Sequence, residues 1–289
     1  MKLKGIDKFM EKTDPVFAGK RIALIPVYFL SLFITGLLVM TSFNNLPNVL
    51  STSGIDGMVL AFLPLIGEGI VGAIGFVMVY QIWFLREKMK AKYGKWAYRR
   101  IFLVGFGGII LVLSMTVISF FPISGTFWSI PPFNVLVTSI DSYLGIAAPF
   151  IAWPRAVLGI VVSIIGLIMI PRSIITFGFD YTTVVYLYFP EESTFQDHAI
   201  YSALRHPMYS GGLTIALGGM IFSFTPYAIL LYVTFLIGFS MHVRFVEEPE
   251  LMSRFGDSYK EYRKKVPAFF VNPARLKTFF GFLFGIRRA

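Results

Sequence analysis

The chain has 289 residues, of which 56% are apolar and 15% charged, and its formal net charge at pH 7 is +10. The apolar fraction exceeds what a soluble domain needs, and the mean hydropathy of +0.70 indicates a membrane protein. The absence of Cys excludes disulfides, thiolate metal sites and a catalytic thiol. The net positive charge would suit nucleic acid or a membrane surface, and its distribution along the chain favours the membrane.

Six apolar runs are long enough to cross about 30 Å of hydrocarbon, which takes roughly 20 helical residues. They are 22–41, 59–85, 101–121, 156–177, 208–224 and 226–245. The polar residues 1–21 lack a signal-peptide cleavage site, so we expect the first apolar run to be retained. The last two runs are separated by a short turn in which Pro226 suits the start of a helix, which predicts a helical hairpin.

Basic residues gather on one side of the predicted membrane. All of the 26 Lys and Arg except Arg155 lie in the segments 1–21, 86–100, 171–207 and 244–289. The three other connections hold none, and they are 42–57, 122–154 and 223–227. The positive-inside rule places the basic segments in the cytoplasm. Because the number of crossings is even, we expect both termini there too.

The predicted fold is therefore a single all-α integral membrane domain spanning 1–289. Four helices belong to 1–177, and 178–289 holds the hairpin and a cytoplasmic tail. The outer connection 122–154 is partly apolar and is expected to lie along the membrane interface. Phe and Leu flanked by cations in 276–288 predict an amphipathic helix on the inner membrane surface.

The segment 67–72, GEGIVG, matches the GxGxxG pattern of dinucleotide sites but lies inside an apolar run, with no strand before it. Close packing of small residues against a neighbouring helix is the better interpretation. Glu68 places a carboxylate in a predicted span, at a cost of about 2.5–3.5 kcal/mol on insertion scales. We expect Glu68 to be protonated or hydrogen-bonded inside the bundle, and a place in a lipid-binding cavity is the alternative.

Polar residues cluster where the inner loop meets the fifth helix. Pro207 suits the first helical turn, which leaves backbone N–H groups at the cytoplasmic mouth of the bundle, a place for a ligand carboxylate or phosphate. Arg205 offers a planar fork of donors, His206 a donor or acceptor, and Tyr209 an amphipathic ring. A basic residue and a His at such a helix end are also ordinary in membrane proteins.

A second cluster follows the sixth helix. Arg244 precedes Glu247 by three residues and Glu248 by four, so on a continuous helix the three side chains would share a face. Two adjacent carboxylates beside a basic tail suit a cationic ligand, and an exposed salt-bridge cluster worth under about 1 kcal/mol is the alternative. Tyr259 and Tyr262 lie on a predicted surface helix, which simple docking on the membrane would also explain.

Taken in order, RHPMYSGG, the hairpin, EEPEL, FGDSYKEY and VPAFF resemble the C-terminal signature of the isoprenylcysteine carboxyl methyltransferase family. The wider group includes phospholipid N-methyltransferases and methanethiol S-methyltransferase. The resemblance covers 201–273 and makes 178–289 a methyltransferase-like catalytic part, whereas the first four helices show no motif of the family. It implies S-adenosylmethionine as cofactor, bound at the cytoplasmic end of the last helices, and a lipophilic acceptor that enters between helices.

The resemblance also implies roles for single residues. Those assigned to the cofactor pocket by position are His206, Pro207, Tyr209, Gly211, Glu247, Glu248, Tyr259 and Tyr262. Arg205, Arg244 and Glu247 are the catalytic candidates, either Arg being suited to orient an acceptor carboxylate, and no metal site is expected. This chain departs from many relatives in having Ala199-Ile200 in place of Gly-Pro, and in having Arg244 as the one basic residue directly before the paired acids.

The best prediction from the sequence is methylation of the carboxylate of a prenylcysteine-like or other lipid substrate. Alignment and desolvation would dominate because that nucleophile is already charged, whereas an amine acceptor would need a base such as Glu or His. The expected partners are the membrane and a lipophilic or lipidated substrate, not nucleic acid, with the active site facing the cytoplasm.

Three alternatives stay open, and two of them belong to other classes of protein. The acceptor could be a lipid amine or a small thiol. An NADPH-dependent reductase similar to membrane sterol reductases would share RHP, the hairpin and an acidic pair, but a Trp is usual there where this chain has Tyr259. A non-catalytic transporter or scaffold is the third alternative. Transport is disfavoured because Glu68 is the one clear charge within the predicted spans.

Overall fold

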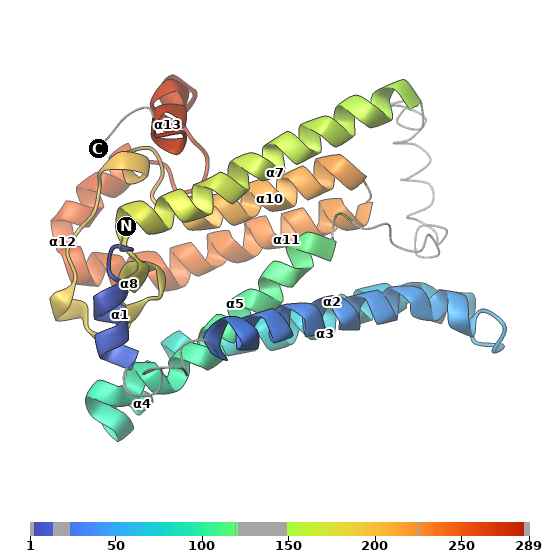
Figure 1. Cartoon of the computed structure of the whole chain (residues 1–289), viewed down its shortest axis with the longest axis horizontal. Coiled ribbons are helices and arrows are strands. Elements are labelled where there is room, and N and C mark those ends of the chain that lie inside the picture. Colours follow the sequence, from blue (N-terminus) through green and yellow to red (C-terminus); the bar gives the residue numbers. More distant parts are fainter. Residues whose placement is uncertain (1–2, 14–23, 119, 121–148, 225, 286–289) are drawn as a thin grey trace.

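A computed structural model of the chain describes the residues 3–13, 24–118, 120, 149–224 and 226–285. This part consists of helices and their connections and contains no β-strand, which confirms the all-α expectation for the described residues. Figure 1 shows two groups of long helices, with a layer of short helices at one end of both groups. The predicted interfacial segment 122–154 lies mostly outside the described residues.

The first group consists of three long helices, α2 (Leu24–Leu50), α3 (Gly57–Phe84) and α5 (Ala97–Ile118). The three pack on one another in all pairs. Helix α3 starts at an N-cap, Asp56, whose carboxylate accepts a hydrogen bond of 2.7 Å from the N–H of Met58. The basic helix α4 (Arg86–Tyr93) and the 3-10 turn η2 (Gly94–Trp96) connect α3 to α5.

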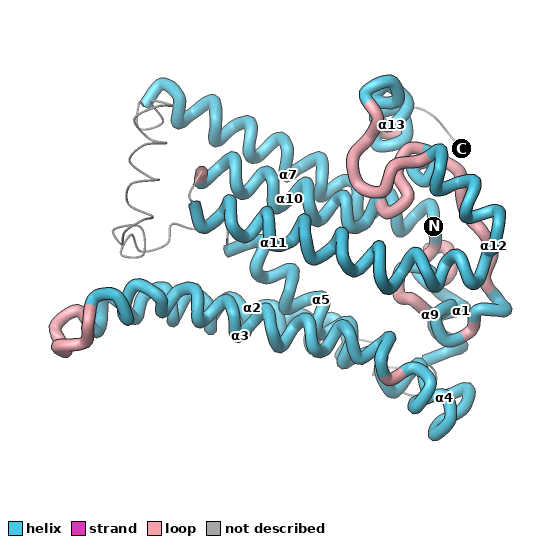
Figure 2. The backbone as a smooth tube through the Cα atoms, turned by 180° about the vertical axis from the view of Figure 1, so that it is seen from behind, coloured by secondary structure: helices cyan, strands magenta, loops and turns pink. Residues whose placement is uncertain are grey.

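The second group consists of α7 (Pro149–Phe177), α10 (Pro207–Ser223) and α11 (Pro226–His242), with α10 between the other two (Figure 2). Glycines bring α7 and α10 close together, because a Cβ at Gly166 would lie 2.6 Å from the carbonyl oxygen of Gly211. Helix α11 continues through a π-helical turn, η6 (Val243–Glu247), into α12 (Glu248–Lys265).

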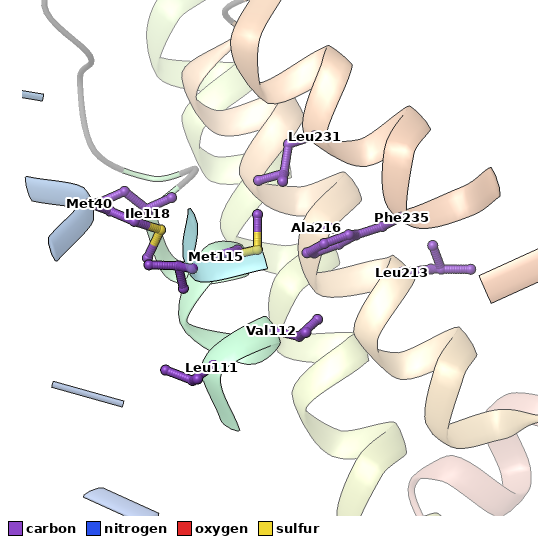
Figure 3. Packing of buried hydrophobic residues seen from close by; sticks show 10 residues of the cluster. Met40, Leu111, Val112, Met115, Ile118, Leu213, Ala216, Leu231 and Phe235 are labelled. Atoms are coloured by element: carbon purple, nitrogen blue, oxygen red, sulfur yellow. The ribbon is translucent and has the colours of Figure 1, made fainter. Parts of the chain in front are cut away.

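The two groups share a hydrophobic core, in which α5 packs against α10. Figure 3 shows Val112 and Met115 of α5 between Met40 of α2 and Ala216 of α10. Val112 and Met115 are each 7% exposed and Ala216 is 2% exposed. Helix α5 therefore fixes the position of the N-terminal group relative to the hairpin α10–α11.

Five stretches of the described chain are long and apolar enough to cross a membrane. They are Leu24–Leu50, Gly57–Phe84, Arg86–Ile118, Trp153–Phe177 and Ala228–Lys265. They overlap five of the six predicted crossings. The sixth, 208–224, forms α10, whose 17 residues make a shorter helix. Helix α2 continues to Leu50, beyond the predicted end at 41, because helical hydrogen bonds persist where the apolar run gives way to polar residues.

Short helices form the layer at one end of the long ones (Figure 1). They are α1 (Ile6–Thr13), α8 (Phe179–Thr182), α9 (Val185–Tyr188), η4 (Pro190–Glu192), η5 (Ala199–Ser202), η7 (Pro273–Arg275) and α13 (Leu276–Leu283). Phe9 of α1 packs edge-on against Phe102 and Phe179, with ring centroids 5.0 Å apart in both pairs. Lys12 forms an ion pair of 2.7 Å with Glu192. The first and last helices of the described chain therefore lie at the same end of the molecule.

Helix α13 occupies the start of the predicted amphipathic segment 276–288. Its residues Phe279 and Leu283 are buried against the C-terminal end of α7, where Arg172 donates a 2.8 Å hydrogen bond to the carbonyl oxygen of Leu283. Leu276 is exposed, and 286–288 lie outside the described residues. The apolar face of α13 thus packs on protein.

The GEGIVG segment forms part of α3 and packs as small residues do between helices. A Cβ at Gly67 would lie 2.5 Å from Cβ of Phe43 in α2, whereas a Cβ at Gly69 would meet no atom within 4 Å. This confirms the interpretation as close helix packing, which was preferred to that as a dinucleotide site. Glu68, between them, is 6% exposed.

Gly67→Leu is expected to destabilise the α2–α3 pair, because the new side chain must displace Phe43. Overpacking of this kind costs about 1–3 kcal/mol. Thermal unfolding in detergent should show a lower midpoint for Gly67→Leu than for the matched control Gly69→Leu. Equal midpoints for the two variants would contradict this packing.

Candidate active site

A cavity of about 670 Å³ lies between the two helix groups at the end that carries the short helices. Its polar end is lined by six of the predicted site residues, namely Arg205, His206, Tyr209, Glu247, Tyr259 and Tyr262. Its apolar arm is lined from α3, α5, α7, α10 and α11 by residues that include Phe76, Val112, Leu113, Ile170, Gly212, Ile237, Gly238, Phe239 and Met241. One space therefore joins a charged pocket to a hydrocarbon-like region.

The start of α10 is held in place by the segment after α12. The N–H of Arg205 donates to the carbonyl oxygen of Pro267 at 2.9 Å, and the N–H of His206 donates to that of Ala268 at 3.2 Å. Pro207 then occupies the first turn of α10, as its fixed φ favours. The carbonyl oxygens of the VPAFF motif thus support the backbone of the RHP motif, which links the two motifs structurally.

Arg205 is engaged through both of its terminal nitrogens on one side of the cavity. Its Nη2 lies 2.6 Å from Oε1 of Glu248, and its Nη1 donates to the carbonyl oxygens of Arg263 at 2.8 Å and Val266 at 2.6 Å. These carbonyls lie at the C-terminal end of α12, where a cation is favourable. Glu248 also pairs with Nε of Arg263 at 3.0 Å. Arg205 therefore ties the end of α12 to the start of α10.

His206 lies between the two acids. Its Nδ1 is 3.3 Å from Oε1 of Glu247, and its Nε2 is 3.5 Å from Oε1 of Glu248. Burial opposes a charge on this imidazole, but the two carboxylates outweigh it and hold the pKa of His206 above its usual value of 6.5. Three buried polar atoms at this end make no hydrogen bond with the described chain, namely Nε of Arg205, Nε2 of His206 and Oε2 of Glu247. They remain available to a ligand.

The raised pKa of His206 predicts how stability depends on pH. A group whose pKa is raised on folding stabilises the fold fully below its unfolded pKa, and this contribution is lost as the pH rises through the folded value. We therefore expect the unfolding midpoint of the ligand-free protein to fall on going from pH 6 to pH 9, and to fall less in His206→Gln. His198→Gln, at an exposed position, should keep the wild-type slope in the same thermal scans, and an unchanged slope in His206→Gln would contradict the assignment.

Tyr259 and Tyr262 close the pocket from α12. Tyr262 donates a 2.6 Å hydrogen bond to the carbonyl oxygen of Tyr201, and the hydroxyl of Tyr259 lies 3.5 Å from Oε1 of Glu248. The ring of Phe195 packs against both, with centroids 6.3 Å from Tyr259 and 5.3 Å from Tyr262. The positive φ of 56° at Gly256 bends α12, so that these rings turn back over the cavity.

The structure does not bring every predicted residue to the cavity. Pro207 and Glu248 lie directly behind its wall and act through their neighbours. Gly211 faces α7 instead, where a Cβ would lie 2.9 Å from Ile170. Arg244 is exposed, lies 5.6 Å from the ring of Phe245, and forms no ion pair with the acids among the described residues.

The expected pairing of Arg244 with the acids is therefore wrong, and the π-helical turn explains why. In a π-helix the backbone hydrogen bonds join residues i and i+5, so side chains leave the positions that the α-helical spacings i+3 and i+4 would give them. His242 precedes Glu247 by five residues, and its Nε2 lies 3.8 Å from Oε2 of that acid. The turn thus presents His242 to the cavity and leaves Arg244 outside.

Several lining residues had no role in the sequence-based site. Tyr80 and Trp83 come from α3, and Glu250 and Arg254 from the first turns of α12, where Arg254 Nε donates a 3.0 Å hydrogen bond to Glu250. Glu250 follows the acidic pair by two residues, and this proximity was a signal for it in the sequence. No pattern in α3 distinguishes the face that carries Trp83 from the faces toward lipid.

Comparison with known proteins finds similarity in the part of the chain that holds the second helix group. Residues 154–258 match the family model described as phospholipid methyltransferase. A probable protein-S-isoprenylcysteine O-methyltransferase of Oryza sativa subsp. indica is 30% identical over 114 residues, which cover 39% of this chain and 60% of that protein. The protein-S-isoprenylcysteine O-methyltransferase of Schizosaccharomyces pombe is 42% identical over 69 residues, which cover 24% of this chain and 29% of that protein.

Two further proteins are similar to this chain. The methanethiol S-methyltransferase of Crocosphaera subtropica is 26% identical over 148 residues, which cover 49% of this chain and 53% of that protein. A solved structure of the eukaryotic intramembrane Ras methyltransferase ICMT (isoprenylcysteine carboxyl methyltransferase) is 20% identical, with a TM-score of 0.40, over 85% of this chain and 96% of that one. With 60% of its length covered, the Oryza sativa relative is matched over less than two thirds of its own chain. Its C-terminal part matches the phospholipid methyltransferase family, with isoprenylcysteine O-methyltransferases among the relatives.

Proposed function

We propose that this protein is an integral membrane methyltransferase that transfers a methyl group from S-adenosylmethionine to a lipophilic acceptor. The observation that carries the proposal is the single cavity, whose charged end continues into an apolar arm. The names of the relatives point to the same class of reaction. A volume of about 670 Å³ lies in the range usual for cofactor and small-molecule sites.

The polar end fits the charges of the cofactor. S-adenosylmethionine carries a carboxylate, an ammonium group and the sulfonium that supplies an activated methyl group. Arg205 Nε and His206 Nε2 are unengaged donors suited to a carboxylate, and Glu247 Oε2 is an unengaged acceptor suited to a cation. We assign Arg205, His206 and Glu247 to binding, and Tyr259 and Tyr262 to excluding water.

The apolar arm is suited to the hydrocarbon part of the acceptor. It runs along α11 from His242 to Thr234, eight residues or roughly 12 Å of helix. An acceptor held there would present its polar head at the charged end, so alignment and exclusion of water would supply most of the catalysis. The family resemblance favours a carboxylate as the methylated group, with amines and thiols as alternatives.

The basic connections suggest the orientation. Helices α4 and α12 carry many of the Lys and Arg, and they lie at the end of the molecule that holds the cavity's charged pocket (Figure 1). The positive-inside rule then places the pocket and both termini on the cytoplasmic side. Lys88→Cys should react with a membrane-impermeant maleimide only when the cytoplasmic side of the membrane is accessible to the reagent.

The direct test of the function uses protein reconstituted in vesicles with S-adenosylmethionine labelled in its methyl group. Label is expected to appear in an organic-extractable product when a lipophilic acceptor is supplied. Label that stays in the aqueous phase with every lipid carboxylate, amine and thiol offered would contradict the proposal.

Gly238→Phe is expected to block the apolar arm. Gly238 lines the cavity and a Cβ there would meet no atom within 4 Å, so a benzyl group fits into the space without disturbing the helix. The variant should bind S-adenosylhomocysteine as the wild type does, while methylation of a dodecyl acceptor falls at least tenfold. Gly69→Phe, at an exposed position on α3 with equally open surroundings, is the matched control. Full activity of Gly238→Phe would show that the acceptor lies elsewhere.

A further inference from the structure

His242 stands where the charged end of the cavity meets the apolar arm. The residue is 7% exposed and its ring lies among three aromatic rings. The centroid distances from its ring are 4.8 Å to Trp83, 5.7 Å to Tyr80 and 5.9 Å to Tyr209. The neighbouring lining residue, Met241, belongs to the apolar arm. A polar head that enters from the arm meets this imidazole first.

The groups that face His242 come from three elements. Helix α3 supplies Tyr80 and Trp83, and helix α10 supplies Tyr209. The π-helical turn supplies Glu247, whose Oε2 lies 3.8 Å from Nε2 of His242 and makes no hydrogen bond within the described chain. His206 lies on the other side of Glu247, against its Oε1. A proton gained by His242 would therefore be stabilised by an adjacent carboxylate.

The Arg side chains that line the cavity each already form an ion pair with a carboxylate. Among the described lining residues the Lys and Arg side chains are Arg205, engaged with Glu248, and Arg254, engaged with Glu250. Arg244, the sequence-based candidate for orienting a carboxylate, lies outside. An acceptor carboxylate at this junction would be buried beside Glu247, with no unpaired Lys or Arg among the described lining residues to balance its charge, an arrangement that costs free energy. A neutral head that carries a proton fits better.

We propose that His242 is the catalytic base of the methyl transfer and that the acceptor is a neutral lipophilic thiol. This rests on the proposed function. As the acceptor sulfur bonds to the methyl carbon, the bond of that carbon to the sulfonium sulfur breaks and its electron pair stays with the departing thioether. The S–H proton passes to a ring nitrogen of His242, and the imidazolium so formed faces Glu247. Solvent takes the proton after the products leave.

Proton affinities favour a thiol over an amine. The usual pKa of a thiol is about 8.5 and that of an alkylammonium about 10.4, against about 6.5 for imidazole. Between the free groups, proton transfer to imidazole is thus uphill by roughly 10²-fold for a thiol and roughly 10⁴-fold for an ammonium ion. Loss of the proton also converts the thiol into the thiolate, which is the reactive nucleophile. An ammonium head would in addition carry its charge through the apolar arm.

The first test compares three acceptors of equal chain length, namely 1-dodecanethiol, dodecylamine and dodecanoate. The thiol should give a methyl thioether, identified by mass spectrometry, at the highest rate. His242→Gln should lower kcat by about 10²–10⁴-fold with little change in KM, as expected for loss of a general base. Arg244→Gln should stay within about twofold of the wild type. Preferred methylation of dodecanoate, with loss of activity in Arg244→Gln, would overturn the proposal.

The second test needs no methyl donor. The chain has three His residues, so ring-labelled histidine gives three signals that His→Gln variants assign. In the ligand-free protein, 1-dodecanethiol should shift the His242 signal and dodecanoate should not. A His242 signal that ignores the thiol, or a His242→Gln variant with wild-type kcat, would overturn the assignment of the base. If the wild type failed to bind S-adenosylhomocysteine, the proposed function itself would fall, and the assignment of the base with it.

Discussion

Replacing Glu247 by Gln is expected to weaken the binding of S-adenosylmethionine by roughly 10–100-fold, because a hydrogen bond to a charged group contributes about 1.5–3 kcal/mol. Glu247 lines the cavity and its Oε2 makes no hydrogen bond within the described chain, and the substitution keeps the size of the side chain while removing its charge. Calorimetric titration of detergent-purified protein measures the loss directly. S-adenosylhomocysteine, which keeps the ammonium group but lacks the sulfonium charge, should lose less affinity than S-adenosylmethionine.

The matched control is Glu261→Gln on the same helix, α12. Glu261 is exposed and pairs with Lys264 at 2.7 Å on the outer surface, away from the cavity. Its substitution should leave both affinities unchanged. If Glu247→Gln bound both ligands as tightly as the control does, Glu247 would have no part in holding the cofactor.

Glu248→Gln is expected to produce the largest loss of stability. Glu248 is 3% exposed and is the shared partner of Arg205 at 2.6 Å and Arg263 at 3.0 Å, with His206 nearby. Removing one member of a buried ion pair typically costs about 3–5 kcal/mol, because the remaining charge is left uncompensated. The buried partner here is Arg205, so the contact between α12 and the start of α10 should loosen.

Arg263→Gln provides the comparison, since it removes a partner of the same carboxylate from a side chain that is 45% exposed. Its effect on the unfolding midpoint should be small, because exposed ion pairs contribute about 0–1 kcal/mol. Equal midpoints for Glu248→Gln and the wild type would show that Arg205 is held by the carbonyl oxygens of α12 alone.

Hydropathy predicted the long helices well, because a chain in hydrocarbon must satisfy its backbone groups within each helix. The helices α2, α3, α5, α7, α10 and α11 each overlap one of the apolar runs identified beforehand. Hydropathy gave the helix ends less accurately. Neither the extension of α2 to Leu50 nor the uninterrupted path from α11 into α12 requires apolar residues.

The candidate site was predictable where its residues follow one another along the chain. Arg205, His206 and Tyr209 line the cavity because Pro207 starts a helix beside them, which the sequence indicates. The orientation of residues near Glu247 was not predictable, because helical spacing assumes an α-helix and the chain forms a π-helical turn there.

Contacts between distant segments had no signal in a single sequence. Trp83 of α3 reaches His242 across 159 positions of the chain, and Arg205 reaches Val266 across 61. Such contacts depend on how the two helix groups pack through α5. The aromatic content of every span hides which ring faces the cavity and which faces lipid.

The measurement that tests the central claim most directly is calorimetric titration of the wild-type protein with S-adenosylhomocysteine and, separately, with NADPH. The account predicts micromolar, one-to-one binding of S-adenosylhomocysteine and no heat from NADPH. Binding of NADPH alone would contradict the account and make the charged end of this cavity the site of a reductase.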